Sequence, residues 1–140
     1  MKKILVMAAL VTLIFTSKHY PQLGFAVAKN NNNSSVKWQL IWNSKTPLTD
    51  ARNKLKNLGY DNVYTLPGGA ECGHNLNSGY WVVIESNYKL SDGKRRTSFG
   101  AGASNYSFSE AECRAMRHLR KYDSNWTTRN GYYLSKTGTF

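Results

Sequence analysis

The first 28 residues constrain the fold most, because they have the pattern of a secretory signal peptide. Lys2 and Lys3 give a basic start, residues 4–15 form an apolar run, and residues 26–28 (AVA) have the small-x-small spacing that a signal peptidase cuts. The apolar run is shorter than the about 20 residues of a membrane-spanning helix. We therefore expect export to a periplasm or to the medium, with cleavage near Ala28. Cleavage nearer Ser17 and an uncut membrane anchor stay open.

Three segments follow from this interpretation. Residues 1–28 are the signal peptide, residues 29–35 (KNNNNSS) are a flexible polar leader, and residues 36–140 form one α+β domain. The whole chain has a formal net charge of +11, and only three of its lysines lie in the first 28 residues. The exported part is therefore strongly basic, which favours an anionic polymer or an acidic protein as partner.

Periodicity predicts five strands and two helices. Apolar residues recur with a period of two in the strands and at spacings of three and four in the helices. Thr46-Pro47 and Ser107 are typical helix starts, while Gly59 is a typical helix end. The expected strands are residues 36–43, 62–66, 80–85, 96–104 and 131–140, and the expected helices are residues 47–58 and 108–122.

The order β-α-β-β-β-α-β predicts the fold class α+β. We expect one mostly antiparallel sheet of about five strands with two helices packed on one face. Gly100 and Gly102 interrupt a strand and predict a close backbone approach at that point.

Two resemblances concern the order of these elements. Residues 100–104 (GAGAS) and 109–119 (SEAECRAMRHL) together resemble the last strand and helix of a double-stranded-RNA-binding domain. That family has a lysine pair at the start of the helix, whereas residues 105–109 (NYSFS) contain no lysine. Each strand–helix–strand half is similar to the sporulation-related repeat domain, which binds cell-wall glycan. Because both resemblances concern topology more than residues, the chain is assigned to neither family.

The two cysteines predict a disulfide. Cys72 and Cys113 are an even pair in a chain that we expect in an oxidising compartment. The alternative is a reactive Cys72 with His74 as its base. The spacing of the cysteines and histidines fits no standard zinc site, so we expect neither a metal nor a cofactor.

Basic residues suggest a binding surface. We expect it to contain Arg95, Arg96, Arg114, Arg117 and Lys121, with Trp126 as an exposed aromatic contact. The same charges also fit a solvated helix face on which Glu110 and Arg114 form an ordinary i,i+4 pair.

Two functions are compatible with these residues. The first, which we favour, is a non-catalytic exported binding module of the inhibitor or immunity type. The second is a small secreted hydrolase such as a nuclease, with His74, Glu85 and His118 as its acid–base groups. Nothing in the spacing of these three residues brings them together.

Overall fold

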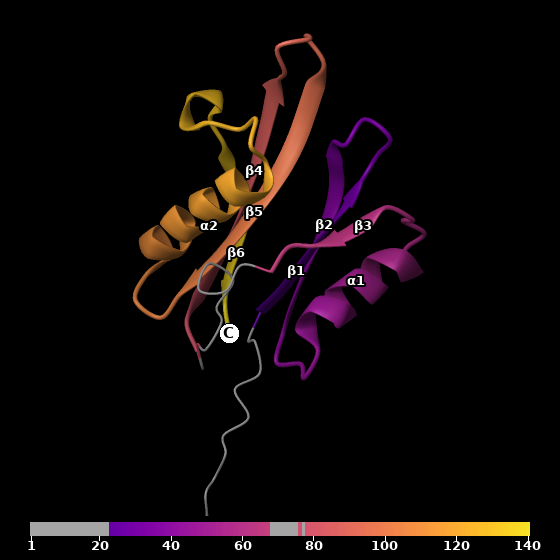
Figure 1. The fold of residues 1–140 in the computed structure, drawn as a ribbon. Coiled ribbons are helices and arrows are strands. Elements are labelled where there is room, and N and C mark those ends of the chain that lie inside the picture. Colours follow the sequence, from indigo (N-terminus) through magenta and orange to yellow (C-terminus); the bar gives the residue numbers. More distant parts are fainter. Residues whose placement is uncertain (1–22, 68–75, 77) are drawn as a thin grey trace, which may run out of the picture.

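The computed structural model describes residues 23–67, 76 and 78–140. Within them the chain forms six strands, two α-helices and one short 3-10 helix (Figure 1). In chain order these are β1 (Leu23–Lys29), β2 (Ser35–Trp42), α1 (Pro47–Asn57), β3 (Val63–Thr65), β4 (Tyr80–Lys89), β5 (Arg95–Ser104), α2 (Phe108–Tyr122), η2 (Thr128–Asn130) and β6 (Tyr133–Thr139). The predicted α+β class is confirmed.

The strands divide into two antiparallel sheets with the same internal order. The first sheet has the order β2-β1-β3 and the second has the order β5-β4-β6. Each half of the chain is therefore a β-β-α-β unit whose first strand lies in the centre of its own sheet. This differs from the single sheet of about five strands that the sequence suggests, because the chain has an additional strand, β1.

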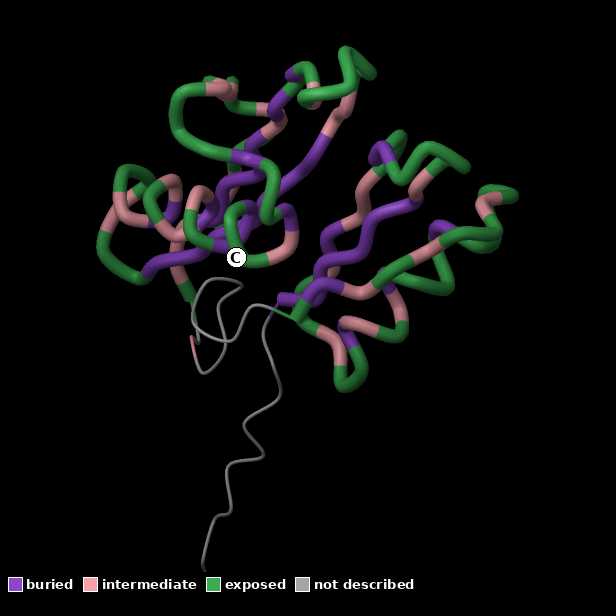
Figure 2. The backbone as a smooth tube through the Cα atoms, turned by 45° about the horizontal axis from the view of Figure 1, so that its top comes forward, coloured by how far each residue is buried: buried purple, intermediate pink, exposed green. Residues whose placement is uncertain are grey.

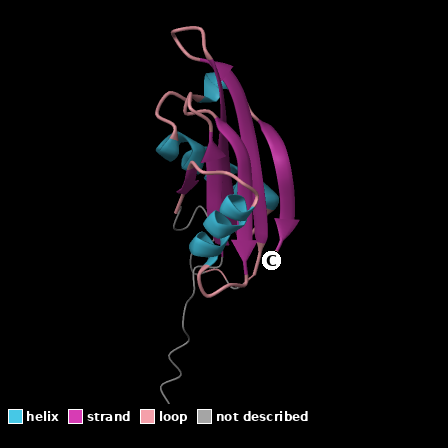
Figure 3. Cartoon of the chain, turned by 90° about the vertical axis from the view of Figure 1, so that its right-hand side faces the viewer, coloured by secondary structure: helices cyan, strands magenta, loops and turns pink. Residues whose placement is uncertain are grey.

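The two sheets pack face to face, with one helix outside each. Phe25 and Val27 of β1 share a buried cluster with Trp81 and Val83 of β4. The intervening residues of each strand point outward: Ala26 of β1 packs with α1, and Val82 and Ile84 of β4 pack with α2. The result is four layers, with α1 and α2 on opposite sides of the strands (Figure 1). Seen from the side, the strands of both sheets run in roughly the same direction (Figure 3), as in aligned sheet packing.

The first sheet contains residues that the sequence assigns to the signal peptide and to the leader. The described end of the predicted signal peptide, residues 23–28, pairs with β2 on one side and in part with β3 on the other. Residues 29–35 do not form a leader but the end of β1, a turn and the start of β2; Asn33 adopts a positive φ of 59° there. Buried stretches run through the strands, while the turns are exposed (Figure 2). Residues 1–22 lie outside the described part of the chain.

Both helices begin where their sequences predict. Thr46 precedes α1 with Pro47 in the first turn, and Gly59 follows it with a φ of +93°. At α2, the Ser107 hydroxyl accepts a hydrogen bond from the backbone N–H of Glu110 (3.1 Å). This bond satisfies one of the N–H groups that a helix start leaves without a partner.

The predicted close approach at β5 is confirmed. A Cβ atom on Gly102 would lie 2.2 Å from the carbonyl oxygen of Ala111, and one on Gly100 would lie 2.4 Å from that of Ala115. Both contacts are with the backbone of α2, which cannot yield as a flexible side chain can. The two glycines therefore let α2 lie directly on β5 and so fix the position of its C-terminal end.

Candidate functional site

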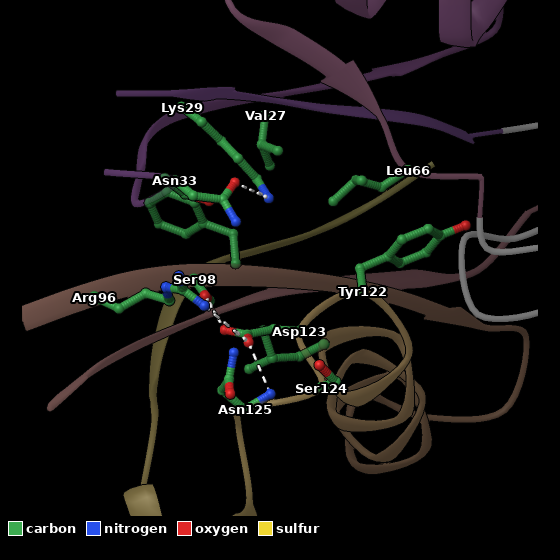
Figure 4. A pocket seen from close by; sticks show the side chains of 13 residues that line it. Val27, Lys29, Asn33, Leu66, Arg96, Ser98, Tyr122, Asp123, Ser124 and Asn125 are labelled. Atoms are coloured by element: carbon green, nitrogen blue, oxygen red, sulfur yellow. Dashed lines mark hydrogen bonds and ion pairs between the residues drawn. The ribbon is translucent and has the colours of Figure 1, made fainter. Parts of the chain in front are cut away.

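A polar pocket lies between the two sheets beside the C-terminal end of α2. It has a volume of about 110 Å³. Val27 and Lys29 come from β1, Asn33 and Ser35 from the turn and the start of β2, Arg96 and Ser98 from β5, and Tyr122 to Asn125 from the end of α2 and the residues after it (Figure 4). Both halves of the chain thus contribute to it.

Asp123 is the anchor of this pocket. Its carboxylate is almost fully buried and accepts hydrogen bonds from the hydroxyls of Tyr88 (2.5 Å) and Ser98. The backbone N–H of Asn125 donates to it as well (3.1 Å), and Arg96 lies 3.8 Å away as an ion-pair partner. A buried carboxylate needs several donors to offset its lost hydration, and Asp123 has them.

Two cations, Lys29 and Arg96, line the pocket together with the single carboxylate of Asp123. The Lys29 ammonium donates to the Asn33 side chain (3.1 Å) and points into the pocket (Figure 4). Burial lowers the pKa of Lys29, the charge of Asp123 opposes that shift, and the charge of Arg96 adds to it. The Nε atom of Arg96 is buried and has no hydrogen-bond partner among the described residues. The pocket therefore carries one more positive charge than negative charge.

Tyr88 is a buried hydrogen-bond partner of Asp123. Burial, together with its hydrogen bond to Asp123, raises the pKa of the Tyr88 phenol to about 12. The phenol therefore stays protonated at neutral pH and acts as a fixed donor to the carboxylate.

His118 is part of the core. It is fully buried, its Nδ1 accepts from the backbone N–H of Ala101 (3.1 Å), and its Nε2 lies 3.0 Å from the carbonyl oxygen of Leu66. Because an amide only donates and a carbonyl only accepts, the ring is neutral with its proton on Nε2. Both ring nitrogens thus bond to the backbone, and through them His118 links α2 to β5 and to the residue after β3.

Of the other two residues of the hydrolase interpretation, only Glu85 lies within the described part of the chain. Glu85 lies on β4, where its side chain accepts a hydrogen bond from Asn87 (3.2 Å). His74 lies outside the described residues, as does Cys72. Cys113 is exposed on α2 and forms no disulfide within the described part of the chain.

The predicted basic surface separates into two kinds of residue. Arg96 turns toward Asp123, and Arg114 bonds to Glu110 (2.7 Å) and to the carbonyl oxygen of Ala103 (2.9 Å). The remaining three are exposed: Arg95, Arg117 and Lys121.

Trp126 differs from the expectation of an exposed aromatic contact. It is only 1% exposed and packs in the cluster between β4 and α2. Its polar neighbours in the sequence belong to the loop around it, and the indole itself fills the core. It is therefore not available to stack on a ligand.

Sequence reasoning misses most of the pocket. Only Arg96 is among the predicted binding residues, since Lys29 falls in the expected leader and Asp123 stands out only as the residue after a helix. The one signal in the sequence is the pair of cations, Arg95 and Arg96, at the start of a strand. Nothing local indicates that Lys29 and Asp123, far apart in the chain, share a cavity.

No described helix is long and apolar enough to cross a membrane. Within residues 23–67, 76 and 78–140 no group of three or more histidine, cysteine or acidic side chains is placed to hold a metal ion. No protein-family model, curated protein or solved structure matches the chain.

Proposed function

We propose that the protein is a non-catalytic exported binding module that takes an acidic group of its partner into the pocket between the sheets. The observation that carries this proposal is the charge of the pocket, where Lys29 and Arg96 share one carboxylate. A partly buried charge without a full counter-charge is unfavourable. An anion placed between the two cations relieves this cost, so the site favours a ligand that brings one.

The size and lining of the pocket favour an acid group over a larger ligand. A cavity of about 150 Å³ holds a benzene molecule, and this pocket is smaller at about 110 Å³. A carboxylate or phosphate group attached to a longer chain fits this volume. Serine and asparagine side chains line the rest and offer hydrogen bonds to its oxygens: Asn33, Ser35, Ser98, Ser124 and Asn125.

The partner classes in this proposal are an anionic polymer or an acidic protein surface. Arg95, Arg117 and Lys121 are exposed, and they add to a basic surface that attracts such partners over a distance of about 10 Å at moderate salt. Binding should therefore weaken as the salt concentration rises. Salt should screen the attraction of the exposed residues more than that of the partly buried charges in the pocket.

Export is part of the same proposal, with a changed cleavage position. The basic and apolar start of the sequence still has the pattern of a signal segment, but a cut after Ala28 would remove most of β1. We place the cut before Leu23, which agrees with the alternative of cleavage nearer Ser17. In an oxidising compartment the pairing of Cys72 with Cys113 stays a prediction, which intact mass with and without a thiol-alkylating reagent tests.

A pair of matched lysine variants tests the pocket. Poly-glutamate and polyphosphate serve as probes for the two acid groups, and titration calorimetry gives their affinities. Lys29→Met removes the pocket charge and keeps the apolar stem, while Lys45→Met removes one charge from an exposed loop. We expect the first variant to weaken binding of at least one probe about tenfold, or 1.4 kcal/mol, and the second to change it far less. Equal losses would mean that only overall charge matters and would refute the pocket.

A further inference from the structure

A second concave surface lies along the free edge of β2, and its residues take no part in the pocket between the sheets. Five consecutive residues of β2 line it, from Trp38 to Trp42, together with Lys54 of α1, Trp81 of β4 and Lys136 of β6. We call this surface the β2 groove. Its volume is about 410 Å³, which lies within the range of about 300–1,000 Å³ that ligand sites occupy.

The backbone of β2 offers hydrogen bonds to the groove. In β1 the carbonyl of Phe25 bonds to Leu66 (2.8 Å) and the N–H of Lys29 bonds to Asn62 (2.9 Å), so alternate residues of β1 face β3. Phe25 pairs with Leu40, and Val27 pairs with Trp38. In an antiparallel ladder these two residues of β2 consequently direct their N–H and C=O groups away from β1.

One side-chain contact agrees with this direction. The Gln39 amide donates to the carbonyl oxygen of Leu40 (3.1 Å), which is accessible because it points away from β1. The β2 strand is the outer strand of its sheet, so no described strand takes up these groups. Open edges of this kind pair readily with an added strand.

The side chains of the groove supply aromatic surface and positive charge. Trp42 is 39% exposed, and its ring centroid lies 5.7 Å from that of Trp81. The Nε1 atom of Trp81 is buried and has no acceptor among the described residues. Lys54 and Lys136 come from elements on either side of β2, and neither forms an ion pair within the described part of the chain.

From this combination we propose that the β2 groove binds an extended acidic segment of a partner protein, which adds to the first sheet as a strand beside β2. Its backbone pairs with the outward groups of Trp38, Leu40 and Trp42. Alternate side chains of an added strand lie on opposite faces of the sheet. Carboxylates on the two faces therefore meet Lys54 and Lys136, and an apolar side chain covers the exposed ring of Trp42. A saccharide would stack on the indole rings but would not form the backbone hydrogen bonds that the edge of β2 offers.

Selection from a peptide library tests the proposal. Random eight-residue peptides displayed on phage are selected on the protein purified from an exporting host. We expect enriched peptides to carry at least two acidic residues. In a synthetic copy of one such peptide, N-methylation of one set of alternate amides should abolish binding, while methylation of the other set should leave it nearly intact. Amide hydrogen exchange at Leu40 should slow in the complex.

Two double variants of equal charge separate the groove from overall charge. Lys54→Glu with Lys136→Glu should weaken binding of the synthetic peptide at least about tenfold. Lys89→Glu with Arg129→Glu should weaken it far less, because Lys89 at the end of β4 and Arg129 in η2 are exposed and do not line the groove. Failure to enrich any peptide, equal losses in the two double variants, or indifference to the position of N-methylation would overturn the proposal. Binding of polygalacturonate in the groove in place of peptides would overturn it in favour of a saccharide site. None of these outcomes depends on the pocket at Lys29.

Discussion

The sharpest prediction concerns a chain that begins at Lys29, where the signal-peptide pattern places the cut. Such a chain lacks the first six residues of β1, including Leu23, Phe25 and Val27, which are exposed by 4%, 0% and 1%. Burying side chains of this size contributes about 1.5–3 kcal/mol each. Their joint loss is about 5–9 kcal/mol, and the hydrogen bonds of β1 to β2 and β3 are lost as well. Because a domain of this size is stable by about 5–15 kcal/mol in total, we expect residues 29–140 alone to be unfolded.

Urea unfolding followed by tryptophan fluorescence measures this difference. Residues 23–140 should unfold in one cooperative transition, and residues 29–140 should show none. In case the shorter chain aggregates, Phe25→Ala gives a second measure, with an expected loss of about 3–5 kcal/mol. Tyr64→Ala is the matched control: it removes an aromatic ring from the neighbouring strand, but the ring is 51% exposed, and we expect a loss below about 1 kcal/mol. A cooperative transition for residues 29–140 with the midpoint of the longer chain would refute the central place of β1.

Four further changes test the core and the pocket. Tyr88→Phe removes a hydrogen bond to the buried Asp123 carboxylate and should lower the free energy of unfolding by about 1.5–3 kcal/mol; in the unchanged protein, absorbance at 295 nm should show this phenol titrating near pH 12. His118→Ala removes the two hydrogen bonds of the buried ring to the backbone of Ala101 and Leu66 and should cost about 2–6 kcal/mol in urea unfolding, and an unchanged midpoint would contradict the core role. Gly102→Ala forces a Cβ atom against the backbone of α2 and should cost about 1–3 kcal/mol or more by thermal unfolding. Lys29→Met should raise the unfolding midpoint at neutral pH. The pKa of Lys29 is lowered in the folded state, so below that pKa the charged lysine opposes folding. In the unchanged protein, stability should rise with pH as Lys29 loses its proton. A lowered midpoint for this variant would show that its charge is already balanced.

The elements that could be predicted from the sequence are those with local signals. α2 combines an apolar stripe with a capping serine, and its predicted bounds, residues 108–122, are those observed. The glycines of β5 predict the close approach because only a missing side chain allows it. In these cases the physical cause lies within a few residues of the chain, so the pattern alone carries the information.

β1 could not be recognised because its residues satisfy two patterns at once. Ala26 and Ala28 are small because α1 packs against them, and the same small residues make the spacing of a cleavage site. The pocket could not be predicted for a different reason. Its charges meet only when two strands from different halves come together, and the buried position of Trp126 likewise depends on contacts with distant elements.

The pKa of the Lys29 ammonium, measured by NMR with and without saturating poly-glutamate or polyphosphate, tests the proposed pocket most directly. An acid group bound between Lys29 and Arg96 stabilises the charged form, so it should raise the pKa from its lowered value in the free protein. The pKa of Lys45, an exposed lysine, should change far less. A Lys29 pKa that stays unchanged at saturation with both probes would contradict the account, because the anion would then be bound elsewhere on the basic surface.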